Sequence, residues 1–426
     1  MRCRMSRRPD PGPFRSAGSR AYADAMLADT DVLVVGAGQA GLAVSHELSS
    51  AGVDHVVVDR ERAGAAWYVR WDSFCLVTPN HTIRLPGGEY DGSDPEGYLP
   101  RDEIILHLRR YAGTIGAPII EHAGVTELRF ADGGFIAETE GGPVRARRVV
   151  ACTGAYQRER RPAFTDELAH HMPVIGSTSY RSPDSLPDGR VLVIGGGQTA
   201  GQITEELLLA GREVVLSAGR APAMPRRVAG RDAVDWLLDA GFFEQTPADL
   251  PSPEARLSPN PLVTGRRGGH DLNLRTLAQA GAHLIGHVRG VDGGRLVIQD
   301  DLAESVATGD EGWNLICGLI SQTAARLGLP EPELPTMPRA SIAVASPPRV
   351  ADIAAVVVAC GFRPDYRWIP IPGVVDDLGF PLQQDGASRS VPGLYFVGVP
   401  WLRTRKSPLL LGVGEDAAVV AAQLVA

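Results

Sequence analysis

Two glycine-rich segments of the same spacing have the composition of phosphate-binding turns. Gly36-Ala-Gly38-Gln39-Ala-Gly41 follows the apolar run 31–35, and Gly195-Gly-Gly197-Gln198-Thr199-Ala200 follows the apolar run 191–194. In such a segment the first glycine allows a sharp turn, the second lets the backbone approach a pyrophosphate, and the third lets helix and strand pack closely. The N–H groups that open the following helix then bind the phosphates. The chain is therefore predicted to bind two dinucleotides.

The residues that end the next strand of each unit differ, and they predict different nucleotides. Asp59, followed by Arg60, ends the strand after the first segment, where a carboxylate can bind both hydroxyls of a ribose. The corresponding strand after the second segment ends at Ser217, and Arg220 follows. Because this position has no carboxylate that would repel a 2′-phosphate, the second site is predicted to prefer NADPH over NADH. The alternative is that Arg220 is a solvated surface residue and the preference is loose.

Two dinucleotide sites in one chain indicate an enzyme that moves electrons between two cofactors. NADPH would deliver a hydride, and FAD in the first site is the natural acceptor, because cofactors carry out chemistry that side chains cannot. A helix that starts near Gly412, after a strand that ends at Gly398, could direct its N-terminus at the flavin and stabilise the reduced anion. The alternative is a surface helix that closes the domain.

The elements around these motifs predict an α/β fold with two Rossmann-like dinucleotide-binding domains, arranged as in glutathione reductase. Each motif lies in a strand–turn–helix–strand unit, which implies a parallel sheet covered by helices. The NADPH domain is predicted to be inserted into a discontinuous FAD domain. The predicted divisions are a disordered tail over residues 1–30, the FAD domain over 31–162 and 352–426, and the NADPH domain over 163–351.

Apolar periodicity and turn residues predict further elements. Helices are expected over 39–50, 100–114, 200–210 and 412–425, a hairpin over 125–139, strands over 353–360 and 394–398, and a proline-rich linker over 329–348.

The composition argues against several other functions. The 426 residues carry a formal net charge of −8, which does not suit a nucleic-acid-binding face. No apolar run approaches the roughly 18 residues of a membrane span. The five cysteines are far apart and include no Cys-x-x-Cys pair, so they predict reduced thiols in a cytoplasmic protein, with no metal site and no redox-active disulfide.

These and several other motifs resemble those of the bacterial class B flavin-containing monooxygenases, and the resemblance covers nearly all of the chain from Asp31 onward. The segments that carry it are 36–41, Asp59-Arg60, Gly64-Ala-Ala-Trp67, Arg70-Trp71-Asp-Ser73, Thr78-Pro-Asn80, Ala151-Cys-Thr-Gly154, Tyr180-Arg-Ser-Pro183, 195–200, Ala359-Cys-Gly-Phe-Arg-Pro364 and 394–398. The resemblance implies that reduced FAD reacts with O2 to form a C4a-(hydro)peroxyflavin, which bound NADP+ protects. A small organic substrate would then take one oxygen atom, by N- or S-oxygenation or by Baeyer–Villiger insertion.

Site residues are assigned from the motifs and the resemblance together. Asn80 resembles an asparagine that these enzymes place beside the flavin, and it is the predicted catalytic residue; the alternative for Asn80 is a turn residue after Pro79. The predicted FAD contacts are Gly36, Gly38, Gln39, Gly41, Asp59, Arg60, Trp67, Trp71, Val125, Thr153, Gly154, Gly398 and Gly412. The predicted NADPH contacts are Gly195, Gly197, Gln198, Thr199, Ala200, Ser217 and Arg220.

One departure from the family pattern keeps other functions open. Aligned on Tyr180, the sequence has Gly176-Ser177 where the family fingerprint has a His-Ser pair. Because that histidine is held to help the domains communicate, its loss favours an NAD(P)H-dependent flavoprotein oxidoreductase or oxidase that inserts no oxygen. A flavin- and nucleotide-binding sensor with little turnover is the alternative from a different class. The substrate is not encoded by any transferable motif.

Overall fold

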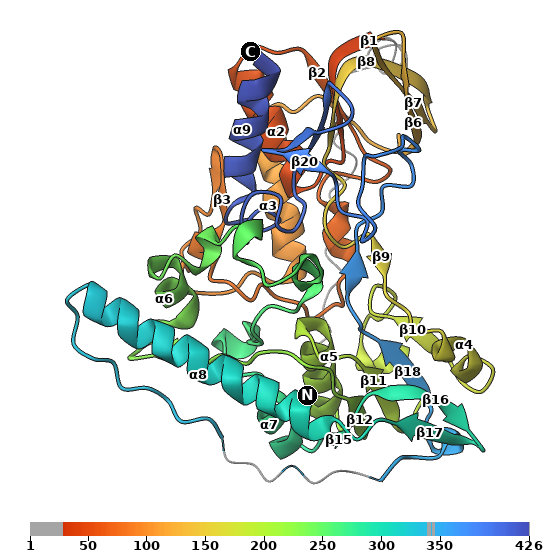
Figure 1. Ribbon diagram of the computed structural model, residues 1–426, viewed down its shortest axis with the longest axis vertical. Coiled ribbons are helices and arrows are strands. Elements are labelled where there is room, and N and C mark those ends of the chain that lie inside the picture. Colours follow the sequence, from red (N-terminus) through yellow and green to blue (C-terminus); the bar gives the residue numbers. More distant parts are fainter. Residues whose placement is uncertain (1–28, 339–341, 343–345, 426) are drawn as a thin grey trace, which may run out of the picture.

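The computed structural model describes residues 29–338, 342 and 346–425. The tail predicted for residues 1–30 lies outside the described residues, except for Asp29 and Thr30, which begin the first strand. Figure 1 shows two sheet-centred units, an upper one that holds the first strand and the C-terminal helix and a lower one from the middle of the sequence. The predicted α/β fold is confirmed.

The upper unit is built on a nine-stranded sheet with the order β20-β21-β22-β8-β1-β2-β5, to which β7 and β6 are added through β8. Its central strands β22, β8, β1, β2 and β5 are parallel. The strands are β1 (Asp29–Val35), β2 (His55–Val58), β5 (Ile119–Ile120), β6 (Val125–Ala131), β7 (Gly134–Thr139), β8 (Gly142–Ala151), β20 (Gln383–Gln384), β21 (Ala387–Ser388) and β22 (Leu394–Phe396). Its helices are α2 (Gln39–Ser50), α3 (Arg101–Thr114) and α9 (Val413–Val425).

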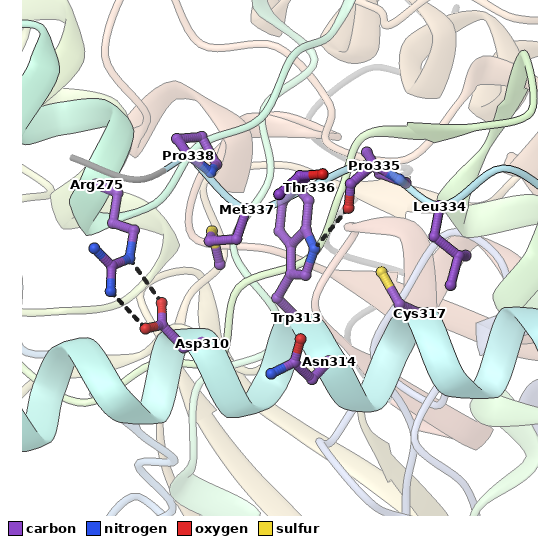
Figure 2. A pocket seen from close by; sticks show the side chains of 10 residues that line it. All are labelled: Arg275, Asp310, Trp313, Asn314, Cys317, Leu334, Pro335, Thr336, Met337 and Pro338. Carbon is purple, nitrogen blue, oxygen red and sulfur yellow. Dashed lines mark hydrogen bonds and ion pairs between the residues drawn. The ribbon is translucent and has the colours of Figure 1, made fainter.

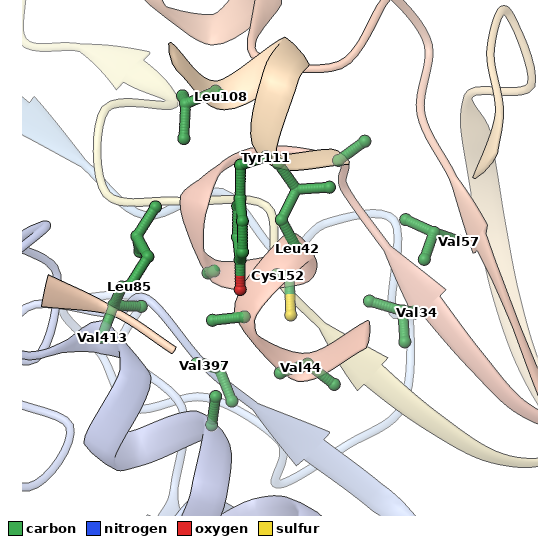
Figure 3. Packing of buried hydrophobic residues seen from close by; sticks show 14 of the residues in the cluster. Val34, Leu42, Val44, Val57, Leu85, Leu108, Tyr111, Cys152, Val397 and Val413 are labelled. Atoms are coloured by element: carbon green, nitrogen blue, oxygen red, sulfur yellow. The ribbon is translucent and has the colours of Figure 1, made fainter. Parts of the chain in front are cut away.

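Buried apolar residues hold these helices on one face of the sheet. The cluster at this contact includes Leu42 of α2, Tyr111 of α3 and Val413 of α9, which lie near Val34 and Val57 of the sheet (Figure 3). A second apolar cluster covers the opposite face, where the predicted hairpin is confirmed as β6 and β7. Because both faces are covered, the central strands are apolar where they cross the core, at 32–35, 56–58 and 149–151, as expected of a parallel sheet.

The lower unit repeats this plan on a five-stranded parallel sheet of order β10-β18-β11-β12-β15. Its sheet strands are β10 (Val174–Gly176), β11 (Val191–Ile194), β12 (Val214–Ser217), β15 (His283–Ile285) and β18 (Ala355–Val358). Its helices are α4 (Phe164–Leu168), α5 (Gln198–Leu209), α6 (Ala233–Asp239), α7 (Leu274–Gln279) and α8 (Leu302–Arg326). Two short two-stranded ladders belong to this unit, β13 (Arg227–Val228) with β14 (Arg231–Asp232) and β16 (Val288–Asp292) with β17 (Arg295–Ile298), while β3 (Arg84–Leu85) and β4 (Gly88–Glu89) form a ladder beside α9 of the upper unit.

The predicted boundary at residue 352 is wrong for one strand. The run 353–360 was assigned to the FAD domain, but β18 pairs with β10 and β11 in the second sheet. An apolar run satisfies either sheet equally well, so only the pairing of its backbone decides which sheet it joins. The chain returns to the upper unit after Cys360.

The two connections between the units run side by side. β9 (Arg158–Glu159) carries the chain down and β19 (Phe362–Arg363) carries it back, and the two strands pair antiparallel. Arg160 N–H also donates to the carbonyl of Gly361 at 2.9 Å. We call this pair of connections the hinge ladder (Figure 1).

The 25-residue helix α8 was not predicted, because its three glycines interrupt the apolar pattern. A Cβ at Gly312 would lie 2.4 Å from the Cβ of Pro222, so glycine is needed there for close packing. The described residues between 329 and 348 form no helix or strand, in agreement with the predicted linker. In the part of the chain that the structure describes, no helix is both long and apolar enough to cross a membrane.

Buried polar groups join the two units. Arg226 and Asp232 form an ion pair with side chains only 2% and 1% exposed. Across the interface, Arg226 Nη1 donates to the carbonyl of Val77 at 2.7 Å, and Tyr98 Oη donates to Asp232 Oδ2 at 2.5 Å. Such a pair is tolerated only when further hydrogen bonds replace lost hydration. Separating the units would remove the bonds to Val77 and Tyr98 and expose the Arg226–Asp232 pair to water.

A second buried carboxylate also spans the interface. Glu206 of α5 accepts hydrogen bonds from Ser73 Oγ of the upper unit at 2.5 Å and from Tyr180 Oη of the lower unit at 2.9 Å. Tyr180 is fully buried and Glu206 is 5% exposed. The backbone N–H of Asp72 donates to the carbonyl of Arg181 beside them, at 2.9 Å.

Replacing Tyr180 by phenylalanine is expected to lower the free energy of unfolding by about 1–3 kcal/mol, because the Glu206 carboxylate stays buried with one donor fewer. Urea denaturation followed by circular dichroism measures this difference. Tyr395→Phe is the matched control, since the Tyr395 hydroxyl forms no hydrogen bond with the described residues. Equal losses for both variants would contradict the interpretation.

Candidate functional site

The first glycine segment forms a turn that side chains would block. Gly36 has a φ of +109°, and a Cβ there would lie 2.6 Å from the carbonyl oxygen of Cys152. A Cβ at Gly41 would lie 1.8 Å from the carbonyl oxygen of Gly36, so α2 can pack on β1 only with glycine at this position. Gly38 differs, because a Cβ there would meet nothing described within 4 Å. This open side of the turn is where a pyrophosphate can approach the backbone.

The second segment adopts nearly the same backbone geometry. Gly38 has φ and ψ of −84° and −171°, and Gly197 has −85° and −174°. Gly195 has a φ of +146°, and its Cβ would lie 2.3 Å from the carbonyl oxygen of Ala359. The third position is Ala200, whose Cβ lies at 3.3 Å from a Cβ built on Gly195, so this turn is wide enough for alanine.

Helices α2 and α5 both begin without a side-chain cap among the described residues, and neither has an acid in its first turn. By contrast, α6 is capped by Asp232 and α7 by Asn273. The first N–H groups of a helix have no partner within the helix, and they attract anions. The two turns that open on glycine therefore present unused donors where a dinucleotide's phosphates are predicted to bind.

Asp59 lies beside the first turn, as predicted for a ribose-binding carboxylate. Its Oδ2 accepts from the N–H of Ala37 at 2.6 Å and its Oδ1 from the N–H of Glu61 at 2.8 Å. Burial raises the pKa of Asp59 above its ordinary value, and the two backbone N–H groups oppose this shift. Each oxygen keeps a lone pair for a ligand hydroxyl. Arg60 is exposed and lies close to Gly124, which precedes the predicted contact Val125.

At the second turn, backbone takes the place that the Asp59 carboxylate has at the first. A Cβ on Gly196 would lie 2.2 Å from the carbonyl oxygen of Gly219, so the loop after β12 packs directly on the turn. Glycine is therefore required at position 196.

The prediction for Ser217 does not fit the structure. Ser217 is 2% exposed; its Oγ donates to the carbonyl of Gly286 at 3.2 Å and accepts from the N–H of Val288 at 3.1 Å. The last side chain of β12 points into the unit, so its hydroxyl is used internally. Arg220 lies on the surface, half exposed, in an ion pair with Glu304. The sequence could not show this acid, which comes from α8.

Gln39 and Gln198, both predicted to contact a cofactor, instead bind the backbone of neighbouring loops. Gln39 Nε2 donates to the carbonyl of Pro408 at 2.7 Å. Gln198 makes two bonds with the backbone of Val263, accepting from its N–H at 3.2 Å and donating to its carbonyl. Each glutamine in the first turn of its helix thus holds a loop beside the glycine turn. Thr199 lies next to Gln198 and is partly buried.

The two tryptophans predicted to contact FAD, Trp67 and Trp71, lie in different surroundings. Trp67 is partly buried and packs against Phe74 with ring centroids 5.8 Å apart. Trp71 is 3% exposed and joins the apolar cluster of the lower unit that includes Tyr180. Trp71 therefore fills the interface, and the structure gives no support to its assignment as a cofactor contact.

Other predicted contacts are brought to the first turn by the ends of neighbouring strands. Thr153 and Gly154 follow Cys152, whose carbonyl oxygen would lie 2.6 Å from a Cβ at Gly36, and both accept from Gln157 Nε2 at 2.7 Å. A Cβ at Gly398 would lie 2.7 Å from the Cβ of Ala40 in α2, so β22 ends beside the same turn.

The start of α9 differs from the starts of α2 and α5. Gly412 packs against the stem of Lys406, with 2.3 Å from a built Cβ to Cγ, and Lys406 Nζ bonds Glu244 and Glu415 at 2.6 and 2.7 Å. The first turn of α9 already contains two acids, Glu415 and Asp416. These carboxylates weaken the anion-stabilising role that was predicted for this helix.

Asn80 holds a loop together. It is 2% exposed; its Nδ2 donates to the carbonyl of Asp94 at 2.8 Å and its Oδ1 accepts from the N–H of Leu99 at 2.6 Å. The amide is thereby engaged at both ends, which favours the structural interpretation over the catalytic one. A flavin contact would require one of these bonds to be given up.

Two cavities lie away from the glycine turns. One of about 630 Å³ lies between α8 and residues 334–338, where Arg275 and Asp310 form a two-bond ion pair and Trp313 Nε1 donates to the carbonyl of Pro335 at 3.3 Å (Figure 2). The other, of about 540 Å³, is lined by Glu205 and His270, which are paired at 2.5 Å. Neither cavity is lined by a predicted cofactor contact.

The cysteines offer no redox pair among the described residues. Cys75, Cys152, Cys317 and Cys360 are all free, and burial raises the pKa of the thiols of Cys75 and Cys360 to about 11. A thiolate is the reactive form, so such thiols are inert. In the same part of the chain, no three His, Cys, Asp or Glu side chains converge as a metal site would require.

Comparison with known proteins agrees with this geometry. Residues 33–229 match the family described as pyridine nucleotide-disulphide oxidoreductase, a span that contains both glycine turns. An oxidoreductase of Geobacillus kaustophilus named CzcO-like is 32% identical over 394 residues, covering 91% of this chain and 96% of that protein. A double mutant of the flavin monooxygenase from Stenotrophomonas maltophilia has a similar fold, with a TM-score of 0.66, 18% identity and 93% and 98% of the two chains covered. The structure of OTEMO in complex with FAD and NADP gives a TM-score of 0.56 at 13% identity, covering 93% and 84%.

The fold and the two turns define a flavoprotein oxidoreductase with two dinucleotide-binding domains. The chain belongs to the same family as the CzcO-like oxidoreductase, and its fold is that of the flavin monooxygenase from Stenotrophomonas maltophilia. The predictions of an FAD-dependent oxidoreductase and of FAD with a nicotinamide nucleotide as cofactors are confirmed at the level of the family. The residue assignments stay predictions.

Sequence reasoning missed the groups that position the site. Glu206, Arg226 and Asp232 lie outside any nucleotide motif, and Ser73 was noted only as part of a family segment. Their role depends on contacts between distant segments, for which the sequence carries no local signal.

Substituting two glycines of the first turn should separate cofactor binding from folding. Gly38→Ala is expected to leave the free energy of unfolding of the apoprotein within about 1 kcal/mol of wild type, because its Cβ meets no described atom, while FAD affinity falls at least tenfold. Gly41→Ala should instead destabilise the fold, because its Cβ would overlap the Gly36 carbonyl. Flavin content and urea denaturation measure both effects. Full flavin binding by Gly38→Ala would contradict the assignment of this turn.

Proposed function

We propose that the protein is an FAD-dependent monooxygenase that uses NADPH and O2, through a C4a-(hydro)peroxyflavin, to oxygenate a small organic molecule at nitrogen or sulfur or by Baeyer–Villiger insertion. The observation that carries the proposal is the pair of uncapped helix starts, which have almost the same dihedral angles and differ in their ribose-side residues. Family membership supports it, and so does the lack of a cysteine pair near the first turn among the described residues.

Different residues would bind each of the two nucleotides. The N–H groups at the start of α2 would bind the FAD pyrophosphate and Asp59 the ribose, while the start of α5 would bind the pyrophosphate of NADPH. Bound FAD would supply the redox chemistry. The protein's own part is to hold both cofactors in fixed orientation and to exclude water, which the buried Arg226–Asp232 and Glu206 contacts favour by locking the units together.

We propose that the preference for NADPH depends on a competition between the 2′-phosphate and Glu304 for Arg220. Arg220 is the basic group at the ribose end of the second turn, but Glu304 neutralises it. A 2′-phosphate would have to displace this acid, and both side chains are exposed enough to separate at little cost. The cofactor preference should therefore be moderate.

One observation favours the second candidate, an oxidase that inserts no oxygen. A Cβ at Gly176, where the family fingerprint has histidine, would lie 1.8 Å from Glu159 Oε2. Glu159 also accepts from Ser177 Oγ at 3.1 Å and from the N–H of Thr178 at 2.8 Å. A carboxylate fills the place of the histidine, so coupling between reduction and oxygen insertion would need other groups.

Stopped-flow oxidation of the NADPH-reduced enzyme distinguishes the two candidates. For the monooxygenase we expect a transient species with the absorbance spectrum of a flavin peroxide, and we expect it to decay faster when substrate is added. Direct return to oxidised flavin with stoichiometric hydrogen peroxide would favour the oxidase instead. An enzyme that NADPH does not reduce at all would rule out both and leave the sensor.

Substitutions at the ion pair test the cofactor preference. Arg220→Ala should raise the KM for NADPH several-fold and leave that for NADH nearly unchanged, because only NADPH carries the 2′-phosphate. Glu304→Gln should lower the KM for NADPH, since Arg220 is then released. Steady-state kinetics with both nucleotides measure these values. Equal effects on NADPH and NADH would contradict the phosphate-binding role of Arg220.

A further inference from the structure

One arginine beside the first cofactor turn has aromatic neighbours where an acid would be expected. The guanidinium carbon of Arg70 lies 4.3 Å from the ring centroid of Tyr156, 5.8 Å from that of Phe362 and 5.9 Å from that of Phe74. The Arg70 guanidinium forms no hydrogen bond or ion pair with the described residues. Stacking uses the face of a guanidinium and leaves the N–H donors at its edge available.

The charged guanidinium of Arg70 is largely removed from water but not completely enclosed. Burial is the main cause that lowers the pKa of Arg70, while the residue remains partly exposed to solvent. Glu159 is the acid whose charge acts on Arg70, but its carboxylate is already bonded to Ser177 and Thr178. A desolvated cation without a bonded anion is costly, and a ligand anion would remove that cost.

The backbone on both sides of this group is fixed. Arg70 N–H donates to the carbonyl of Trp67 at 3.1 Å, and its own carbonyl accepts from Arg101 Nη1 at 3.0 Å. On the other side, Gln157 bonds Thr153, Gly154 and the N–H of Asp365, which braces the loop that carries Tyr156. The guanidinium is thus held in place before any ligand binds, which reduces the entropy lost on binding.

The position lies between the cofactor turn and the hinge ladder. Trp67, a predicted FAD contact, is three residues before Arg70, and Tyr156 is two residues after Gly154 at the end of β8. Phe362 belongs to β19 of the hinge ladder. A molecule bound to Arg70 would therefore touch segments that flank the predicted flavin site.

We propose that Arg70 binds the carboxylate of an organic acid substrate whose apolar or aromatic body lies against the neighbouring rings. This inference rests on the proposed function and names its substrate class. The planar fork of arginine matches a carboxylate with two parallel hydrogen bonds. The phosphates of NADPH are assigned to the start of α5, and no contact of Arg70 with the described residues involves that turn.

Titration of the FAD-loaded full-length enzyme with matched acids and amides tests this assignment. The probes are phenylacetate and indole-3-acetate against phenylacetamide and indole-3-acetamide, followed by the change in flavin absorbance. We expect the acids to bind at least tenfold more tightly than the amides, with an advantage that shrinks as salt is raised. Equal affinity of acids and amides, or no binding of either acid at 10 mM, would overturn the proposal.

Variants identify the residue responsible. Arg70→Met should reduce the affinity for the acids to that for the amides, and Arg70→Lys, which keeps the charge but not the fork, should give an intermediate value. Arg363→Met is the matched control, because Arg363 lies on the hinge ladder and forms no ion pair with the described residues. Loss of acid binding in the control, or a tenfold loss of NADPH affinity in Arg70→Met, would overturn the assignment of Arg70 to the substrate.

The outcome is independent of the oxygen chemistry. A wild-type enzyme that prefers acids but forms no transient oxygenated flavin contradicts only the monooxygenase proposal. One that forms the transient but does not discriminate acids from amides contradicts only the role of Arg70.

Discussion

Two helices that begin on glycine without a side-chain cap impose the central constraint on this molecule. Their first N–H groups need a partner, and among the described residues no side chain supplies one. Glycines keep the turns tight enough for the donors to converge and open enough for a ligand to reach them. The parallel sheets then serve to place one such turn at the carboxyl end of β1 and the other at that of β11.

Placing two turns on one chain is useful only if the units keep a defined orientation. The buried contacts of Arg226, Asp232 and Glu206 join loops of the upper unit to helices of the lower one, and the hinge ladder fixes the points where the chain crosses. These contacts are polar and directional, so they specify an orientation more narrowly than apolar packing would. The hinge ladder also places the carboxylate of Glu159 against Gly176, where a Cβ would lie 1.8 Å from Glu159 Oε2.

The sequence predicted the parts of the site that depend on the local backbone. The glycine turns, the helices that follow them and the position of Asp59 were all foreseen, because spacing along one strand–turn–helix unit fixes them. Predictions that depended on side-chain direction were less successful. Ser217 points inward, Trp71 fills the interface, and Gln39, Gln198 and Asn80 hold loops. A side chain's partner can come from anywhere in the chain, as Glu304 does for Arg220.

By itself the sequence determined that this protein has two dinucleotide-binding units, since short-range geometry demands glycine at fixed intervals. Tertiary structure alone decided that β18 belongs to the second sheet, that α8 brings Glu304 to Arg220, and that Arg70 lies among rings with no bonded counter-charge in the described residues. The physical reason is that burial and pairing are properties of segments brought together from distant positions. An apolar run or a lone arginine has the same local chemistry wherever the fold places it.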